Sequence, residues 1–511
     1  MDDKIIVTNS NALIKKYEDK GLARICKALT ELSASDKERG IKTNVIYLDD
    51  KSSMKKVRGK AVTNATDPRE NKEAIDAVFK SFNPHYIMIL GAPDVVPHQD
   101  LDNPAYIPGK DDDREVWSDL PYACDTPYSR DPSLFVGPTR VVGRLPDLFS
   151  ATEPSYIISL LKKVVNYKMA LLDDYKSYIG LSAKVWQGSS RISVKNLFGS
   201  DDNLLLAPPS GPNFPKNKLR PPMHFINCHG GPASPEFYGQ SGNSYPVSLT
   251  TKSISGKIPE GTVAAVECCY GAELYDSITL AIDRPICQSY LEQGSYGYFG
   301  STTIAYGPAD SNGAADFICQ YYLQNVLNGA SVGRAALMAR QQFVGNTAQM
   351  DAFDLKTLAQ FCLLGDPSVQ PIAQPSGKVV PTGVNEADAE RFSRIERRQK
   401  LKMTGDFLAK TKPTASKRIP IHKLSSKSTA ALNNITKRAG LRNKQKFIAF
   451  AVQVPSTVKD RMTKITTVPS RYLVTITIPK GKKDEKIKRG IAVVAKELNG
   501  RIVGYRIYHQ R

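Results

Sequence analysis

The sequence of 511 residues predicts an α/β protein that ends in a small β-rich region. Up to about residue 370, short apolar runs alternate with segments of helical periodicity. The apolar runs are continuous, which is typical of parallel strands that helices cover on both faces. After residue 446, four strand-like segments follow one another without a helix between them.

The first α/β half spans residues 1–150. Its predicted elements are, in order, a strand at Lys4–Thr8, a helix at 12–32, a strand at 45–48, a helix at 71–82, and strands at Tyr86–Leu90 and 140–143. Residues 97–137 are rich in Asp, Pro and Tyr and are expected to form a long loop region. The run Asp111-Asp112-Asp113 lacks the residue spacing of a calcium-binding loop, so we expect a solvated loop there.

The second α/β half spans residues 151–375. Its predicted elements are a helix at 153–171, strands at Met223–Asn227, 262–268 and 295–299, and helices at 314–327, 332–343 and 355–361. Residues 376–446 are expected to form a basic linker with one amphipathic helix at 388–403. Residues 447–511 are expected to form the β-rich domain, with strands at 447–454, 472–479, 490–498 and 501–509. The last two strands flank Asn499-Gly500, a strong hairpin signal.

The composition excludes some protein classes. No run of about 18 apolar residues exists, so the sequence predicts no transmembrane helix and no membrane partner. The N-terminus lacks the basic and apolar segments of a secretory signal. The eight cysteines are irregularly spaced, which favours reduced thiols over a disulfide framework. We therefore expect a cytoplasmic protein.

Charge is distributed unevenly along the chain. Residues 376–511 hold 32 Lys and Arg against 9 Asp and Glu, whereas the preceding residues hold 38 against 41. A flexible basic segment attracts nucleic acid or an acidic protein in a salt-dependent way. The basic region is therefore the expected contact for an activating protein or a nucleic acid, with a merely solubilising role as the alternative. Such a segment is also exposed to proteolysis, and self-cleavage there is a further hypothesis.

Two chemistry-bearing segments follow predicted strands. His229 comes directly after the strand Met223–Asn227 and precedes two glycines, and Cys268-Cys269 end the next strand along the chain. Functional groups of parallel sheets gather at the carboxyl ends of the strands. If these strands are neighbours, imidazole and thiol face each other, and the thiolate acts as the nucleophile.

Other interpretations remain open at this point. A single buried cysteine usually serves only as a small apolar residue of the core. A single His-Gly pair usually belongs to a turn without a catalytic role. Cys228, His229, Cys268 and Cys269 could also converge on zinc, although no paired CxxC spacing supports this. Since the pair of strand ends favours nucleophilic catalysis, we expect no metal and no cofactor.

The motifs NCHGG and ECCYG, in this order and spacing, resemble the caspase-like cysteine peptidases (clan CD), and most closely the gingipain-type family. MILGAPDVVP, TRVVGRLP, GSYGYFGSTTIAYGP and LLGDPSV resemble further segments of that family. The resemblance covers roughly residues 80–372. It implies a caspase/gingipain-like fold, with a parallel-rich sheet flanked by helices in two halves.

The resemblance also implies roles for particular residues. His229 matches the catalytic histidine. Cys269 matches the nucleophile in the commoner frame of a small residue followed by Cys, and Cys268 is the alternative. The backbone N–H groups of Gly230 and of the nucleophile would form the oxyanion hole. The acid that orients the histidine in gingipains has no clear match, so a Cys-His dyad is expected.

Specificity is expected to depend on two segments. In gingipains that cleave after arginine, an aspartate lies in a short segment before the histidine, and Arg191 stands at the similar position here. Arg191 would then favour an acidic P1 side chain; an exposed loop arginine is the alternative. Tyr306 and Ser301, in the segment resembling the wall of the specificity pocket, are candidate substrate-binding residues, although Tyr306 could equally belong to the core.

The sequence therefore predicts a cysteine endopeptidase that acts on a protein substrate and is latent until a partner or processing activates it. A defence or cell-death role would follow from analogy with the clan alone. The alternative is an inactive peptidase-like scaffold whose basic C-terminal region binds nucleic acid or a ribonucleoprotein. A zinc hydrolase is a third, weaker interpretation.

Overall fold

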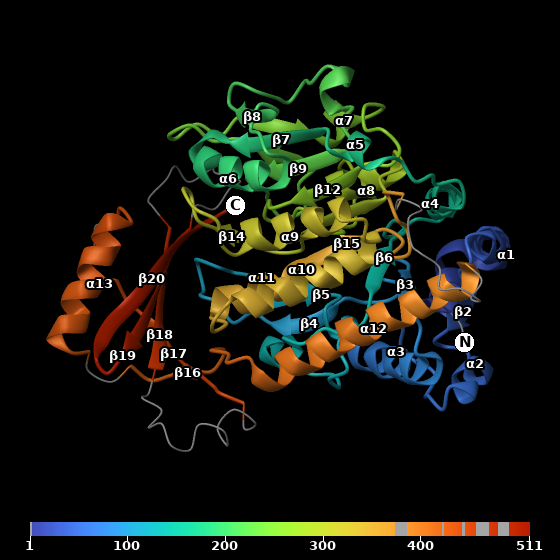
Figure 1. The fold of residues 1–511 in the computed structure, drawn as a ribbon, viewed down its shortest axis with the longest axis horizontal. Coiled ribbons are helices and arrows are strands. Elements are labelled where there is room, and N and C mark those ends of the chain that lie inside the picture. Colours follow the sequence, from blue (N-terminus) through green and yellow to red (C-terminus); the bar gives the residue numbers. More distant parts are fainter. Residues whose placement is uncertain (1–2, 374–385, 422–423, 442–444, 456–469, 479–489) are drawn as a thin grey trace.

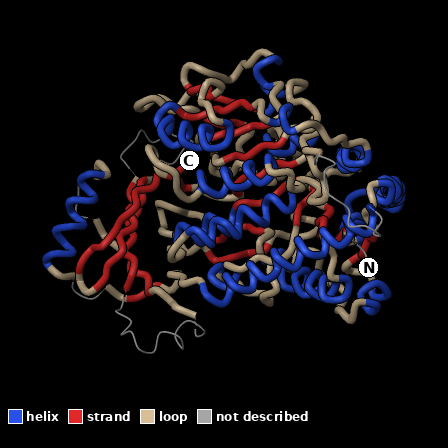
Figure 2. Tube along the Cα trace, in the orientation of Figure 1, coloured by secondary structure: helices blue, strands red, loops and turns tan. Residues whose placement is uncertain are grey.

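The computed structural model describes residues 3–373, 386–421, 424–441, 445–455, 470–478 and 490–511. It confirms the predicted α/β class. A large, mostly parallel sheet lies between two layers of helices, and a smaller antiparallel sheet stands at one side (Figures 1 and 2).

The large sheet has ten strands in the order β2-β1-β3-β6-β15-β13-β12-β9-β7-β8. The runs β2-β1-β3-β6 and β13-β12-β9-β7-β8 are parallel, and β15 runs antiparallel to β13. The strands are β1 (Lys4–Thr8), β2 (Thr43–Tyr47), β3 (Tyr86–Leu90), β6 (Val142–Leu145), β7 (Tyr178–Ala183), β8 (Leu204–Ala207), β9 (Met223–Asn227), β12 (Val263–Val266), β13 (Gly297–Ser301) and β15 (Phe361–Leu364). Most predicted strands are confirmed, whereas β7, β8 and β15 were not foreseen.

Helices cover both faces of this sheet (Figure 1). On one face lie α3 (Pro68–Phe82), α6 (Gln187–Phe198), α9 (Ala315–Leu327) and α10 (Val332–Asn346); on the other lie α1 (Ser10–Glu38), α4 (Ser155–Val165) and α8 (Ile286–Glu292). The α/β body also contains α2 (Lys51–Lys56), α5 (Leu172–Tyr175), α7 (Thr251–Ile254) and α11 (Ala352–Gln360). None of the helices in the described ranges has both the length and the hydropathy that crossing a membrane requires.

The smaller sheet has the order β14-β20-β19-β18-β17-β16. Its strands are β14 (Tyr306–Gly307), β16 (Arg418–Ile419), β17 (Ile448–Ala451), β18 (Ser470–Thr477), β19 (Ile491–Leu498) and β20 (Arg501–Gln510). The predicted hairpin is confirmed, because Leu498 pairs with Arg501 and both Asn499 and Gly500 have positive φ. The sequence did not foresee β14, which belongs to the α/β body and joins it to β20.

The segment expected to be a linker contains two helices, α12 (Glu386–Thr411) and α13 (Ser426–Arg438). The predicted helix at 388–403 lies inside α12, which packs against α10. A Cβ atom on Gly405 would collide with the carbonyl oxygen of Pro138, so α12 approaches the body closely at a point where only glycine fits. Residues 376–385 of the expected linker lie outside the described residues.

The region 97–137 was expected to be loop, yet it contains an antiparallel pair of strands, β4 (Gln99–Asp102) and β5 (Glu115–Ser118). A second short pair, β10 (Glu236–Tyr238) and β11 (Val247–Thr250), follows His229. The carboxyl ends of β7, β9, β12 and β13 meet at one edge of the large sheet, and the candidate site lies there.

Candidate active site

The strands that carry the histidine and the two cysteines are neighbours, which meets the condition set from the sequence for a shared site. β9 and β12 pair in parallel, with Met223 opposite Val263 and Ile226 opposite Val266. The ladder ends at these residues, and the turns that follow β9 and β12 carry His229 and Cys269. The two turns therefore lie at the same edge of the sheet.

Gly230 lies directly against the cysteine turn. A Cβ atom at this position would collide with the carbonyl oxygen of Cys269 and would lie 3.4 Å from Cβ of Cys268. Any side chain would therefore push the two turns apart, which is the physical reason for glycine after His229.

Backbone and side-chain hydrogen bonds fix the position of His229. Its N–H and C=O exchange hydrogen bonds of 2.8 and 2.9 Å with Tyr238. Its Nε2 lies 2.7 Å from Oε1 of Gln240, whose own Nε2 donates to the carbonyl oxygen of Gly242 at 2.9 Å. Because the amide nitrogen of Gln240 is used for Gly242, its oxygen accepts from Nε2 of His229, and Nδ1 is then the basic nitrogen of the ring. Sequence reasoning missed Gln240 and the ring of Trp186, which contacts His229 with a centroid distance of 4.3 Å.

Cys269 is buried, with an exposed fraction of 3%. Its Sγ accepts a hydrogen bond from the N–H of Ala305 at 3.3 Å and lies 3.6 Å from the carbonyl oxygen of the same residue. Burial raises the pKa of this thiol to about 12, and the nearby Asp113 and Asp111 add to the effect, against the N–H of Ala305 and the ammonium of Lys356. In this conformation Cys269 is therefore a protonated thiol.

Cys268 has a different environment. It is fully buried, and the pKa of its thiol is raised well above the ordinary value by burial and by the neighbouring Cys228. The hydroxyl of Ser301 donates to the carbonyl oxygen of Cys268 at 3.1 Å, so Ser301 holds the cysteine turn. Cys269 thus contacts Ala305, in the segment leading into β14, whereas the carbonyl oxygen of Cys268 contacts Ser301; which of the two is the nucleophile stays a prediction.

The acidic run before β5 is part of this site, and the expectation of a solvated loop is wrong for two of its three residues. Asp111 is fully buried and accepts from Nζ of Lys356 at 2.6 Å and from the hydroxyl of Tyr306 at 3.0 Å. Asp113 accepts from the hydroxyl of Tyr270 at 2.6 Å and from the N–H of Ile304 at 2.8 Å. A lysine ammonium occupies the place where calcium would have to bind. Tyr306 is buried within this network.

A second buried acid links the two turns. Oε2 of Glu273 accepts a hydrogen bond of 2.7 Å from the N–H of Ala233, four residues after His229. Burial raises the pKa of Glu273 to about 7, against the effect of that N–H. Glu273 is thus a titratable connection between the histidine turn and the cysteine turn, and no motif pointed to it.

An arginine from the end of β20 fills a cavity beside the thiol. Arg511 is fully buried, and its Nη2 donates to Oδ1 of Asp316 at 3.0 Å and to the carbonyl oxygen of Pro308 at 2.8 Å. Oε2 of Glu267 lies 3.9 Å away, and the guanidinium stacks on Trp186 at 4.5 Å from the ring centroid. The backbone N–H of Arg511 donates to the carbonyl oxygen of Ala305 at 3.0 Å. Sequence reasoning missed this arrangement, since its members come from four distant segments.

Arg191, the residue expected to select an acidic P1 side chain, lies on the outer side of α6. Its side chain is half exposed, and its guanidinium Nε lies 3.4 Å from the carboxylate of Asp201. In the same segment, the buried Ser189 reaches the cavity instead, with its Oγ 3.5 Å from Nη2 of Arg511. The substrate-binding role of Arg191 stays a prediction.

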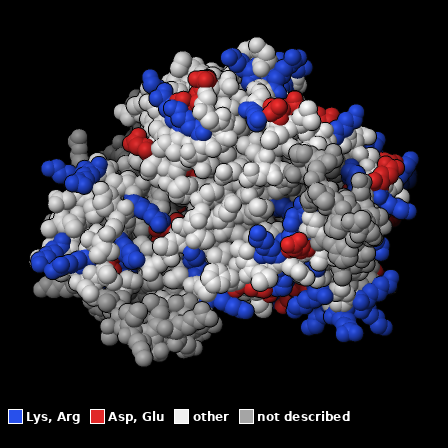
Figure 3. All heavy atoms as spheres, viewed as in Figure 1, with Lys and Arg blue, Asp and Glu red and all other residues white. Residues whose placement is uncertain are grey.

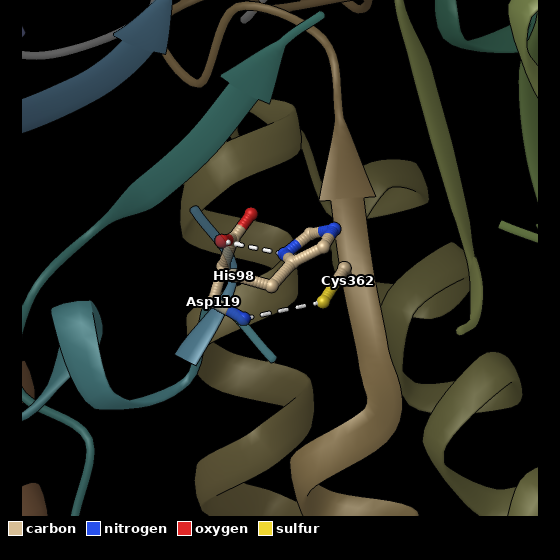
Figure 4. Close-up of side chains that lie close together, drawn as sticks. All are labelled: His98, Asp119 and Cys362. Carbon is tan, nitrogen blue, oxygen red and sulfur yellow. Dashed lines mark hydrogen bonds and ion pairs between the residues drawn. The ribbon is translucent and has the colours of Figure 1, made fainter. Parts of the chain in front are cut away.

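The zinc interpretation gains no support. Among the described residues, one group of at least three His, Cys, Asp or Glu side chains brings its donor atoms within 4.8 Å of one another, and it does not include Cys228, His229, Cys268 or Cys269. The group is His98, Asp119 and Cys362, here called the Cys362 cluster (Figure 4). Arg144 donates to both carboxylate oxygens of Asp119, at 2.8 and 2.6 Å, so the cluster already contains its cation.

Comparisons with known proteins found no matching family model and no matching curated protein. Ten chains of solved structures match. One of them, described as "Structure of Protease", has a TM-score of 0.46 and 14% identity, and the alignment covers 99% of this chain and 97% of that chain.

Proposed function

We propose that the protein is a cysteine endopeptidase of the caspase/gingipain-like type, with Cys269 as nucleophile and His229 as the proton-transfer group. The observation that supports the proposal is the parallel pairing of β9 and β12, after which Gly230 lies against the carbonyl oxygen of Cys269. The contact with Gln240 supports it, because that contact leaves Nδ1 of His229 as the base.

The chemistry follows from these roles. His229 takes the proton of the Cys269 thiol, and Sγ attacks the peptide carbonyl carbon. The N–H groups of Gly230 and Cys269 stabilise the oxyanion. When the C–N bond breaks, the amine leaves with the proton that His229 returns. Water then hydrolyses the thioester and restores the thiol and a free carboxylate. No cofactor is needed for these steps.

Covalent labelling tests the proposal. Peptidyl acyloxymethyl ketones with Arg, Lys, Asp or Leu at P1 are incubated with the full chain, and the adduct is located by mass spectrometry. We expect an adduct on Cys269 that is lost in Cys269→Ala and in His229→Ala, and retained in Cys268→Ala, the matched control. Labelling of Cys268 in Cys269→Ala at the wild-type rate would reverse the assignment of the nucleophile.

The basic region is proposed as the contact for an activating partner. Lys and Arg gather in separate groups on the face shown in Figure 3 and do not merge into one patch there. The choice between an acidic protein segment and a nucleic acid stays a prediction. The scaffold alternative would require that Cys269→Ala leaves the biological activity unchanged.

A further inference from the structure

The cavity around Arg511 holds a second group of buried charged residues beside the cysteine turn. Both of its carboxylates, on Glu267 and Asp316, are fully buried, and they face one guanidinium. Burial raises the pKa of both acids, that of Glu267 well above its ordinary value. Two buried carboxyl groups without a cation are costly. The cavity is therefore built for a positively charged side chain, and the ring of Trp186 suits a planar guanidinium better than a point charge.

The backbone around Arg511 is arranged like a bound peptide. Gln510 pairs with Tyr306 and His509 pairs with Gly307, so the end of β20 extends β14 as an antiparallel strand. Addition of a strand to an exposed edge is a general mode of peptide recognition. The carbonyl oxygen of Ala305 accepts from the N–H of Arg511 and also lies next to Sγ of Cys269. The residue in the cavity thus lies directly beside the candidate nucleophile.

We propose that this cavity is the P1 pocket, that it selects arginine, and that β20 inhibits the protein by occupying its own substrate groove. In this arrangement Arg511, Gln510 and His509 take the places of P1, P2 and P3. The inference rests on the proposed function, and it reverses the acidic P1 preference expected from Arg191. Asp316 and Glu267 supply the charge, Trp186 supplies the stacking surface, and β14 supplies the backbone partners.

The way β20 is held is consistent with an inhibitor that can leave. Much of its first half is exposed, whereas Tyr508, Gln510 and Arg511 are buried. A cleft of about 690 Å³, lined by residues 308–314 and 505–509 among others, runs beside the strand. Figure 1 shows β20 crossing from the smaller sheet to the body, where it ends next to α6 and β14. A tethered strand acts at an effective concentration of about 1 mM, so a short peptide competes poorly until the strand is displaced.

A binding experiment tests the pocket without catalysis. A fluorescent heptapeptide with the sequence of residues 505–511 is titrated against the full chain in the Cys269→Ala background. We expect the chain with Arg511→Ala to bind the peptide about 30-fold more tightly than the chain that keeps Arg511. Adding Asp316→Asn to Arg511→Ala is expected to abolish this binding. A heptapeptide with Asp in place of its final Arg is not expected to bind. Arg501→Ala, at the exposed start of β20, is the control for a change of charge on the strand.

Reactive probes separate the two proposals. We expect the arginine ketone to label Cys269 about 30-fold faster in Arg511→Ala than in wild type, with Arg511→Lys in between. Faster labelling by the Asp or Leu ketone would overturn the arginine pocket while leaving the peptidase standing. Equal rates in wild type and Arg511→Ala would overturn self-inhibition. Peptide binding without labelling of any variant would overturn the peptidase alone. Should Arg511→Ala fail to fold, Arg506→Gln, which weakens the contact of β20 with Asp351 and Asp354, is expected to raise labelling in the same direction.

Discussion

The Cys269 site and the Cys362 cluster are built from similar residue types but differ in what else reaches them. In the cluster, Nδ1 of His98 lies 3.0 Å from Asp119, and Sγ of Cys362 accepts from the N–H of Asp119 at 3.4 Å. Arg144 then uses both oxygens of that carboxylate. At the Cys269 site the imidazole is held by a neutral amide, the ammonium of Lys356 lies near the thiol, and a second cation, Arg511, comes from the strand proposed to inhibit the protein.

The electrostatics of the two regions separate a structural from a chemical role. Burial alone would raise the pKa of Asp119, but the Arg144 guanidinium and His98 hold it well below the usual range. Burial raises the pKa of the Cys362 thiol to about 12, and the carboxylate of Asp119 adds to the effect. A histidine next to a cysteine is therefore not sufficient for a site. What distinguishes the Cys269 site is an edge strand and a charged cavity next to the thiol.

The largest expected effect in this comparison concerns Asp119→Asn. The change removes one charge of a buried pair and leaves the Arg144 guanidinium uncompensated, so we expect a loss of about 3–5 kcal/mol in the free energy of unfolding. Urea denaturation at pH 7 measures it. Cys269→Ala is the matched contrast, with an expected change within about 1 kcal/mol but complete loss of labelling. Equal stability of the Asp119 variant and wild type would show that the cluster is not structural.

A smaller effect is expected from Glu273→Gln, which replaces one of the buried acids at the active site whose pKa is raised. Its pKa of about 7 exceeds the ordinary value near 4.5, so the folded protein keeps a proton that the unfolded chain has lost between these pH values. Stability therefore falls as the pH rises through this window, by up to about 3 kcal/mol. The glutamine variant should show a shallower slope that lacks the contribution of Glu273, because its amide oxygen still accepts from the N–H of Ala233 and does not titrate. Denaturation curves from pH 4.5 to 7.5 measure it, and an unchanged slope in the variant would contradict the assignment.

The local parts of the fold could be predicted from the sequence. Continuous apolar runs identified β1, β3 and β9 with their bounds, and Asn499-Gly500 identified a hairpin, since positive φ is needed at both positions. The adjacency of β9 and β12 was a condition of the predicted site, and the structure meets it. α13 was missed because its buried apolar residues, Leu432 and Ile435, are too few to give a clear helical stripe.

The rest of the site depends on contacts between distant segments. Asp111 is buried because Lys356, 245 residues later, neutralises it, and no local pattern shows this. In the proposed P1 pocket, Arg511 directly follows β20, and its carboxylate partner Asp316 lies on α9. One signal was available: Glu267 is a charged residue directly after an apolar strand and next to the cysteines. Such a residue is buried at a cost, which is a reason to expect a function.

The smallest expected effect sharpens the comparison between the two histidines. Gln240 acts as a positioning residue, since its Oε1 accepts from Nε2 of His229 and orients Nδ1. In the Arg511→Ala background, we expect Gln240→Leu to lower kcat/KM on an arginyl fluorogenic peptide about tenfold, or about 1.4 kcal/mol. Gln240→Glu keeps the acceptor and adds the charge that Asp119 gives to His98. It should restore the rate and move the acidic limb of the pH–rate profile to higher pH, because a carboxylate stabilises the imidazolium. A leucine variant with unchanged kcat/KM, or a glutamate variant with an unmoved profile, would show that Gln240 does not orient the base.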